Sequence, residues 1–145
     1  AACSSAAMIA GSSEEVSDAL WGYGMELGRA FQLVDDILDL VGDDFIGKPR
    51  GTDVHEGKMT LPIIYALTML HGSDRDQLKD VLTNFGDDRL HELVELLKQA
   101  GSFEYAKLLV SNHVERALGH IERLPDSEEK EMLTEIALIS ESRTN

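Results

Sequence analysis

Three carboxylates interrupt an apolar run over residues 31–39, which reads FQLVDDILD. At about 100° of rotation per helical residue, Asp35, Asp36, Asp39 and Gln32 fall within one quadrant of a helix. That quadrant adjoins the apolar face of the same helix, where a carboxylate loses water and needs a compensating positive charge. Oxygen ligands at this spacing suit Mg²⁺, which typically shares carboxylates with substrate phosphates and keeps several waters. We therefore predict a magnesium site at Asp35, Asp36 and Asp39, with ordinary solvated surface charge as the open alternative.

A glycine-rich segment over residues 42–58 follows the aspartates and carries Lys48, Arg50 and Lys58. Its four glycines and one proline disfavour regular secondary structure, so we expect a loop. Loops of this length in compact domains are usually either functional or disordered. Because the chain has a formal net charge of −14, cations grouped directly after the aspartates favour diphosphate ligands over ordinary surface charge. Asp53, in the same segment, is expected either to support the metal ligands or to form a turn.

Composition indicates a helical protein that forms one domain or half of a larger one. The chain has 145 residues, of which 43% are hydrophobic and 6% aromatic, and it contains three prolines. Its acidity excludes a nucleic-acid partner, because a phosphate backbone requires a basic face. No apolar run reaches the roughly 20 residues of a membrane span, and no basic-then-apolar signal sequence opens the chain. The single cysteine, Cys3, cannot form an internal disulfide, so we expect a cytoplasmic protein.

One long helix must position the aspartates. Ser12 and Glu15 form a capping box at its start, and the apolar periodicity continues to Val41, which predicts a helix of about 29 residues. Three glycines inside this helix predict the close approach of a neighbouring helix. The expected core-facing stripe consists of Val16, Leu20, Tyr23, Leu27, Phe31, Val34, Leu38 and Val41.

Shorter helices complete the chain. Residues 1–10 are expected to form a helix that ends at Gly11. Residues 61–70 are apolar on most sides, which predicts a buried helix. The pattern contains no strand alternation and predicts an all-α fold. On the last amphipathic helix, the expected apolar face consists of Met132, Ile136 and Ile139. The other amphipathic helices are expected to begin at Asp74, near Leu90 and at Ser102.

The sequence resembles the second aspartate-rich region of the trans-isoprenyl diphosphate synthases, which include polyprenyl, geranylgeranyl and farnesyl diphosphate synthases. FQLVDDILD, the GD that follows it, and GKPRGTDVHEGKMTLPIIYAL carry the resemblance, which is most specific between Gly28 and Leu67. It implies an all-α helical bundle of the isoprenoid synthase type, with a central cavity, in a homodimer. It also implies a Mg²⁺-dependent prenyltransferase that condenses an allylic diphosphate with isopentenyl diphosphate to make a longer trans-prenyl diphosphate.

The resemblance implies a role for each matching residue. Asp35 would be the main magnesium ligand, and Asp36 and Asp39 would contribute directly or through water. The two lysines of the following segment would be catalytic, because they would stabilise the departing diphosphate. The residues that would bind the allylic diphosphate are Gln32, Lys48 and Lys58.

Other parts of the family pattern are absent. The first aspartate-rich motif is missing, and so are the basic residues that bind isopentenyl diphosphate. We therefore expect residues 1–145 to be the C-terminal part of a single synthase domain, inactive alone and partnered by the N-terminal half in the same protein or a separate chain. A non-catalytic helical subunit of a heteromeric synthase is an alternative, although such subunits often lose the aspartates. A class I terpene cyclase fragment is less favoured, because residues 111–115 lack the spacing of its later metal motif.

Overall fold

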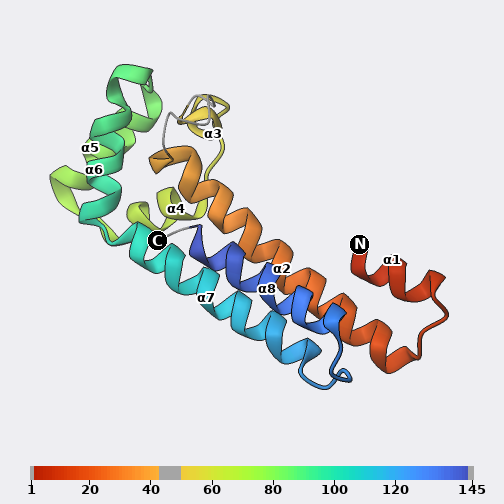
Figure 1. Cartoon of the computed structure of the whole chain (residues 1–145). Coiled ribbons are helices and arrows are strands. Elements are labelled where there is room, and N and C mark those ends of the chain that lie inside the picture. Colours follow the sequence, from red (N-terminus) through yellow and green to blue (C-terminus); the bar gives the residue numbers. More distant parts are fainter. Residues whose placement is uncertain (1, 43–49, 144–145) are drawn as a thin grey trace. The chain divides into compact units, whose positions relative to one another are not determined.

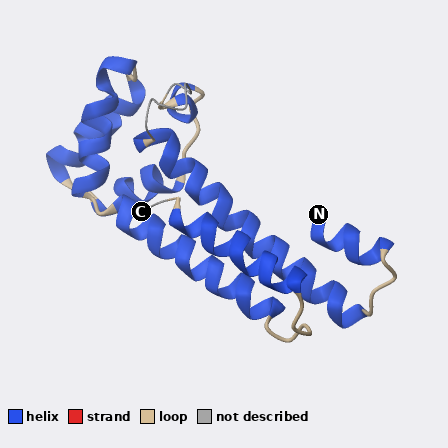
Figure 2. Ribbon diagram, in the orientation of Figure 1, coloured by secondary structure: helices blue, strands red, loops and turns tan. Residues whose placement is uncertain are grey.

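The computed structural model describes residues 2–42 and 50–143, and every regular element in these ranges is a helix (Figures 1 and 2). The all-α expectation is therefore confirmed for the described part of the chain. None of the helices there is long and apolar enough to cross a membrane. The elements are α1 (Ala2–Ile9), α2 (Glu14–Val41), α3 (Thr52–His55), α4 (Leu61–Met69), α5 (Gly72–Thr83), the 3₁₀ helix η2 (Asp87–Arg89), α6 (Leu90–Gln99), α7 (Ser102–Ile121) and α8 (Glu128–Ser142).

The chain divides into two compact units. Ala1–Val34 and Leu109–Asn145 form the first unit, and Asp35–Leu108 forms the second. Helix α2 carries residues of both units because the boundary falls within it. Its start is correctly predicted to within one residue, but the capping hydroxyl belongs to Ser13, whose Oγ accepts from the backbone N–H of Val16 at 3.4 Å. The helix then contains 28 residues, close to the expected length.

In the first unit, α2, α7 and α8 lie side by side (Figure 1). The buried Tyr23 hydroxyl donates to the carbonyl of Leu133 in α8 at 2.7 Å, and burial raises the pKa of Tyr23 to about 12. At Gly22, a Cβ would overlap the imidazole of His120 in α7. The expected close approach of a neighbouring helix is therefore confirmed at Gly22.

The second unit has an apolar core to which each of its described α-helices contributes. The end of α2 supplies Ile37 and Leu40, which are each 1% exposed. Helices α5 and α6 pack side by side (Figure 1), and both contribute residues to this core. The remaining members are Val54, Ile63, Ala66, Leu70, Leu78, Val81, Leu93, Leu96, Leu97, Phe103 and Ala106.

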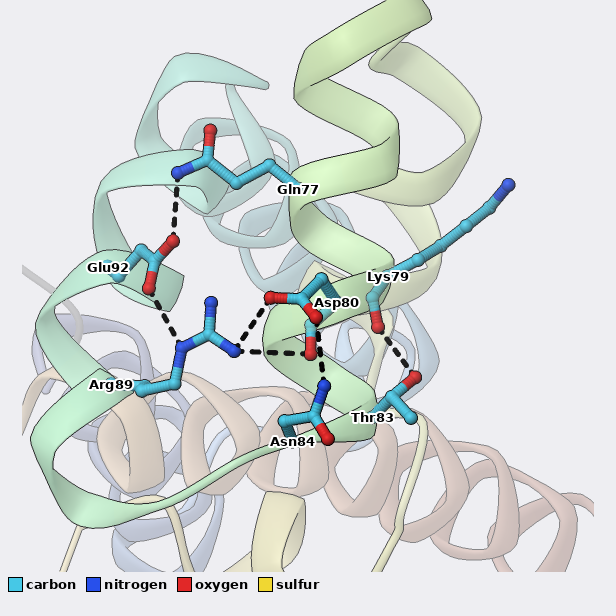
Figure 3. Close-up of polar contacts among 7 residues, drawn as sticks. All are labelled: Gln77, Lys79, Asp80, Thr83, Asn84, Arg89 and Glu92. Carbon is cyan, nitrogen blue, oxygen red and sulfur yellow. Dashed lines mark hydrogen bonds and ion pairs between the residues drawn. The ribbon is translucent and has the colours of Figure 1, made fainter.

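Arg89 fixes the corner between α5 and α6, as Figure 3 shows. Its guanidinium bonds the carboxylate of Asp80 at 2.9 Å and that of Glu92 at 3.0 Å. Glu92 also accepts from the side-chain amide of Gln77 at 2.8 Å, and Asp80 accepts from that of Asn84 at 2.8 Å. Hydrogen bonds with Glu92 and Asp80 raise the pKa of Arg89, so the corner keeps its positive charge. These bonds tie α5 to α6 on both sides of η2.

The predicted core face of α2 is correct at Tyr23, Leu27 and Val34 but wrong at two positions, and that of α8 is wrong throughout. In α2, Phe31 and Val41 are each 40% exposed, because the last turns bury Ile37 and Leu40 in the second core instead. In α8, the three expected core residues are all exposed, and the buried side chains are the small Ala137 and Ser140. Small side chains permit close helix contact, which periodicity of large apolar residues does not indicate. The three α8 residues are Met132, Ile136 and Ile139.

Three further expectations about element position and burial need correction. Residues 52–55 form α3 inside the segment expected to be a loop. Helix α5 begins at Gly72 and not at Asp74. Helix α4 is only partly buried, because Ile64 and Met69 are each 49% exposed.

Candidate metal and diphosphate site

The three aspartates lie on the last turns of α2 with different exposure. Asp35 is exposed, whereas Asp36 and Asp39 are 9% and 6% exposed. The difference follows from helical geometry, because Ile37 and Leu40 turn into the core of the second unit and draw the adjoining positions inward. Asp36 and Asp39 therefore border the apolar core, on the side of Ile37 and Leu40 and not along the predicted stripe, whereas Asp35 faces solvent.

Asp39 joins the end of α2 to the segment that carries α3. Its backbone carbonyl accepts from the N–H of Gly51 at 2.7 Å. Its side-chain Oδ2 accepts from the N–H of Asp53 at 3.1 Å. Since Asp53 is 14 positions further along the chain, these two bonds return the segment to the aspartate-bearing turn.

Helix α3 is held from its other side by the α5–α6 corner. Gly51 has φ of 73°, and a Cβ there would lie 3.0 Å from the ring of Phe85. The imidazole of His55 contacts the same ring edge-on, with 4.8 Å between the two ring centroids. Its Nε2 also bonds the Asp87 carboxylate at 2.7 Å. Val54 is buried in the core of the second unit, so the short helix has a defined position there.

Lys58 follows α3 and is held by two carboxylates. Its Nζ donates to Oδ1 of Asp53 at 2.8 Å and contacts Oε2 of Glu56 at 2.7 Å. Hydrogen bonds to Asp53 and Glu56 raise the pKa of Lys58 above its ordinary value, so the group stays an ammonium. Its side chain is 57% exposed, which leaves it accessible to a dissolved anion.

The remaining predicted ligands are placed only in part. Gln32 is exposed one turn before Asp35 on α2. Arg50 is exposed and has a polar interaction of its own. Lys48 lies outside the described residues, so its predicted role stays a prediction. The sequence did not identify Glu56 as a partner of Lys58, and the two-residue spacing between them is too common to serve as a signal.

The three aspartates supply the kind of donor that magnesium takes, but they do not form a metal site by themselves. Over residues 2–42 and 50–143, no three His, Cys, Asp or Glu side chains lie together so that they could hold a metal ion, and Asp35, Asp36 and Asp39 are no exception. Magnesium rarely needs such a cage, because one or two carboxylates, several waters and substrate phosphates satisfy its octahedral shell. The hard oxygen donors of Asp35, Asp36 and Asp39 are of the required kind.

Comparison with known proteins decides the family. The family model for polyprenyl synthetase matches residues 1–100, which is more than half of the chain. The chain belongs to the polyprenyl synthetase family. The resemblance noted in the sequence is therefore confirmed, and with it the all-α fold of the isoprenoid synthases.

Individual members of the polyprenyl synthetase family match nearly the whole chain. A short chain isoprenyl diphosphate synthase of Methanothermobacter thermautotrophicus is 40% identical over 139 residues, which cover 94% of this chain and 42% of that protein. A polyprenyl synthase of Caulobacter crescentus, solved with calcium and isoprenyl diphosphate, is similar with a TM-score of 0.89 at 29% identity, covering 98% of this chain and 44% of the other. A geranylgeranyl pyrophosphate synthase of Corynebacterium glutamicum, solved with isoprenyl diphosphate and magnesium, has a TM-score of 0.84 at 30% identity, covering 93% and 40%. The chain thus spans about two fifths of the length of these relatives.

Proposed function

We propose that this chain supplies the second aspartate-rich metal and diphosphate site of a Mg²⁺-dependent trans-prenyltransferase. The complete enzyme would condense an allylic diphosphate with isopentenyl diphosphate into a longer trans-prenyl diphosphate. The observation that carries the proposal is the link from Asp39 to Asp53 and Lys58, because it brings an ammonium to the carboxylate-bearing end of α2. Solved relatives that hold isoprenyl diphosphate with magnesium or calcium support the same ligand chemistry.

Each side chain has a separate task in this proposal. Asp35 is the exposed carboxylate and would hold magnesium first, with Asp36 and Asp39 contributing from their buried positions. When bound, magnesium would withdraw negative charge from a diphosphate and so favour its departure. Lys58 keeps a positive charge beside the site and would stabilise the same leaving group. The other proposed diphosphate ligands are Gln32 and Lys48.

The proposal requires protein beyond these 145 residues. The chain matches about two fifths of its relatives, so a complementary N-terminal half would supply the opposing metal ligands and the isopentenyl diphosphate site. That half would belong to the same protein or to a separate chain, and the chain alone would be inactive. A cytoplasmic homodimer is part of the proposal, and light scattering of the complete enzyme checks the assembly.

Binding of a non-hydrolysable allylic diphosphate to the chain tests the site assignment. We expect binding that requires magnesium, is abolished by Asp35→Ala, and weakens about tenfold in Lys58→Gln. Lys98→Gln is the matched control, since Lys98 is a comparably exposed lysine paired with Glu95 on α6. Unchanged binding in Asp35→Ala would show that the assignment is wrong and would favour a non-catalytic subunit. Robust chain elongation by these 145 residues alone would contradict the proposed dependence on a second half.

A further inference from the structure

The two partners of Lys58 differ in how firmly they are held. The side chain of Asp53 is 21% exposed, whereas that of Glu56 is 55% exposed. Exposed ion pairs are screened by water and salt, so the bond to Asp53 is the more persistent of the two. Asp53 also makes a second link to the lysine, because its backbone carbonyl accepts from the N–H of Lys58 at 2.8 Å.

Asp53 is itself fixed by an acceptor on α2. Its N–H donates to Oδ2 of Asp39, a carboxylate that is 6% exposed. A hydrogen bond to an ionised acceptor is stronger than one between neutral groups, and burial strengthens it further. On the far side of α3, the contacts of His55 with Asp87 and Phe85 hold the same turn. Asp53 therefore occupies the middle of a chain of bonds that runs from α2 to Lys58.

We propose that Asp53 is a positioning residue that couples Asp39 to Lys58, so that Asp39 anchors the lysine-bearing turn in addition to any contact with a metal. The inference rests on the proposed function, in which Lys58 binds a diphosphate. An ammonium has three N–H donors, and within the described structure Asp53 and Glu56 accept two of them. In a diphosphate complex the third donor would bond a ligand oxygen, and exposed Glu56 would give up its place to a second one. Asp53 keeps its bond and holds the ammonium in position while the diphosphate binds.

The rate at which an amine-acylating reagent labels Lys58 tests this coupling directly. Labelling is read by mass spectrometry on the whole chain, and Lys98 serves as the internal reference because its side chain is 55% exposed and also paired with one glutamate. We expect Asp53→Asn to raise labelling of Lys58 relative to Lys98 by about two- to five-fold, the range that loss of a partly exposed ion pair produces. Glu56→Gln should raise it less than Asp53→Asn. An equal or larger effect of Glu56→Gln would overturn the assignment of Asp53.

Variants of α2 test the link to the helix. Asp39→Ala removes the acceptor for the Asp53 N–H and should raise Lys58 labelling, although residue 39 does not touch the lysine. Asp39→Asn keeps an acceptor oxygen and should restore labelling to nearly the native rate. Asp35→Ala removes an exposed carboxylate of the same helix and should leave Lys58 labelling unchanged. Identical labelling in Asp39→Ala and Asp35→Ala would overturn the anchoring role. If Asp39→Ala unfolds, Lys98 labels faster as well, and the comparison of Asp53→Asn with Glu56→Gln still decides the proposal.

Magnesium with inorganic diphosphate separates this inference from the proposed function. If Lys58 binds a diphosphate, magnesium and diphosphate together should protect Lys58 from labelling in the native chain and leave Lys98 unprotected. Absence of protection would contradict the diphosphate role of Lys58 and, with it, the proposed function. The ranking of the variants without ligand would then still report the bonds between Asp39, Asp53 and Lys58.

Discussion

Replacement of Gly51 by alanine should loosen the turn that carries Lys58. Gly51 has φ of 73°, in the left-handed region, and lies against Phe85 and Leu90. An added Cβ would meet Cζ of Phe85 at 3.0 Å and Cδ1 of Leu90 at 3.3 Å. Gly57 has the same φ of 73° but no atom within 4 Å of its hypothetical Cβ. Gly57→Ala is therefore a matched control that carries the backbone strain without the steric contact.

The two substitutions should lower the free energy of unfolding by different amounts. A left-handed alanine costs about 1–2 kcal/mol relative to glycine, and both variants lose this much. Crowding a packed contact costs about a further 1–3 kcal/mol, and only Gly51→Ala incurs it. We expect Gly51→Ala to be about 2 kcal/mol less stable than Gly57→Ala. At about 2–4 °C per kcal/mol for a chain of this size, the difference in Tm is about 4–8 °C.

Urea and thermal unfolding followed by far-ultraviolet circular dichroism measure this difference. Both variants should keep native helix content at low temperature, because α3 contains only four residues. Equal stability of Gly51→Ala and Gly57→Ala would refute the close docking of α3 on Phe85 and Leu90.

Two ionisable groups of the first unit give pH predictions. Burial alone would raise the pKa of Glu26, but its hydrogen bond from His113 at 2.6 Å, together with the charges of His113, Arg29 and Arg116, lowers it overall. Its contribution to stability is thus present above pH 4.5 and lost as the pH falls below that value. Glu26→Gln should make the stability, measured by circular dichroism, depend less on pH in this acid range. Burial raises the pKa of Tyr23 from 10.0 to about 12, so its contribution is present below pH 10.0 and lost as the pH rises through about 12. Tyr23→Phe should lower the free energy of unfolding by about 1 kcal/mol at neutral pH, because the bond to Leu133 is lost. In urea unfolding measured at a series of pH values, the variant should not show the loss of stability at alkaline pH.

Local sequence signals predict most helices of this chain. Apolar periodicity and glycine stops identify α1, α2, α4, α6 and α7 close to their observed bounds. At the start of α8, the Ser127 hydroxyl accepts from the N–H of Lys130 at 3.2 Å, which is a local signal of the same kind. These signals act over one or two turns, so a single sequence carries them in full.

The wrong predictions concern interactions between distant residues. Helix α3 forms in a glycine-rich segment because Asp39 and Phe85 hold it from two sides, at separations that no local pattern encodes. The buried side of α2 changes between the two units, since Ile37 and Leu40 enter a core that the first turns do not share. Helical period alone cannot show where one packing partner replaces another.

The candidate site, too, was predictable only where it depends on local helical geometry. Helical geometry predicts that all three aspartates border the core; the low exposure of Asp36 and Asp39 agrees, whereas Asp35 is exposed. The bond from Asp53 to Asp39 was not predicted, because it depends on the path of the intervening segment. The metal and diphosphate roles come from the family resemblance and stay predictions, as does the role of Lys48.

Condensation by a completed enzyme tests the central claim most directly. The chain is fused to the part of the Methanothermobacter thermautotrophicus synthase that it does not match, and labelled isopentenyl diphosphate is supplied with an allylic diphosphate and magnesium. We expect elongated prenyl diphosphate, a loss of at least about 100-fold in Asp35→Ala, and no loss in Asp76→Ala, which removes an exposed carboxylate on α5. Elongation by the Asp35→Ala fusion at the rate of the Asp76→Ala fusion would contradict a catalytic metal site on α2.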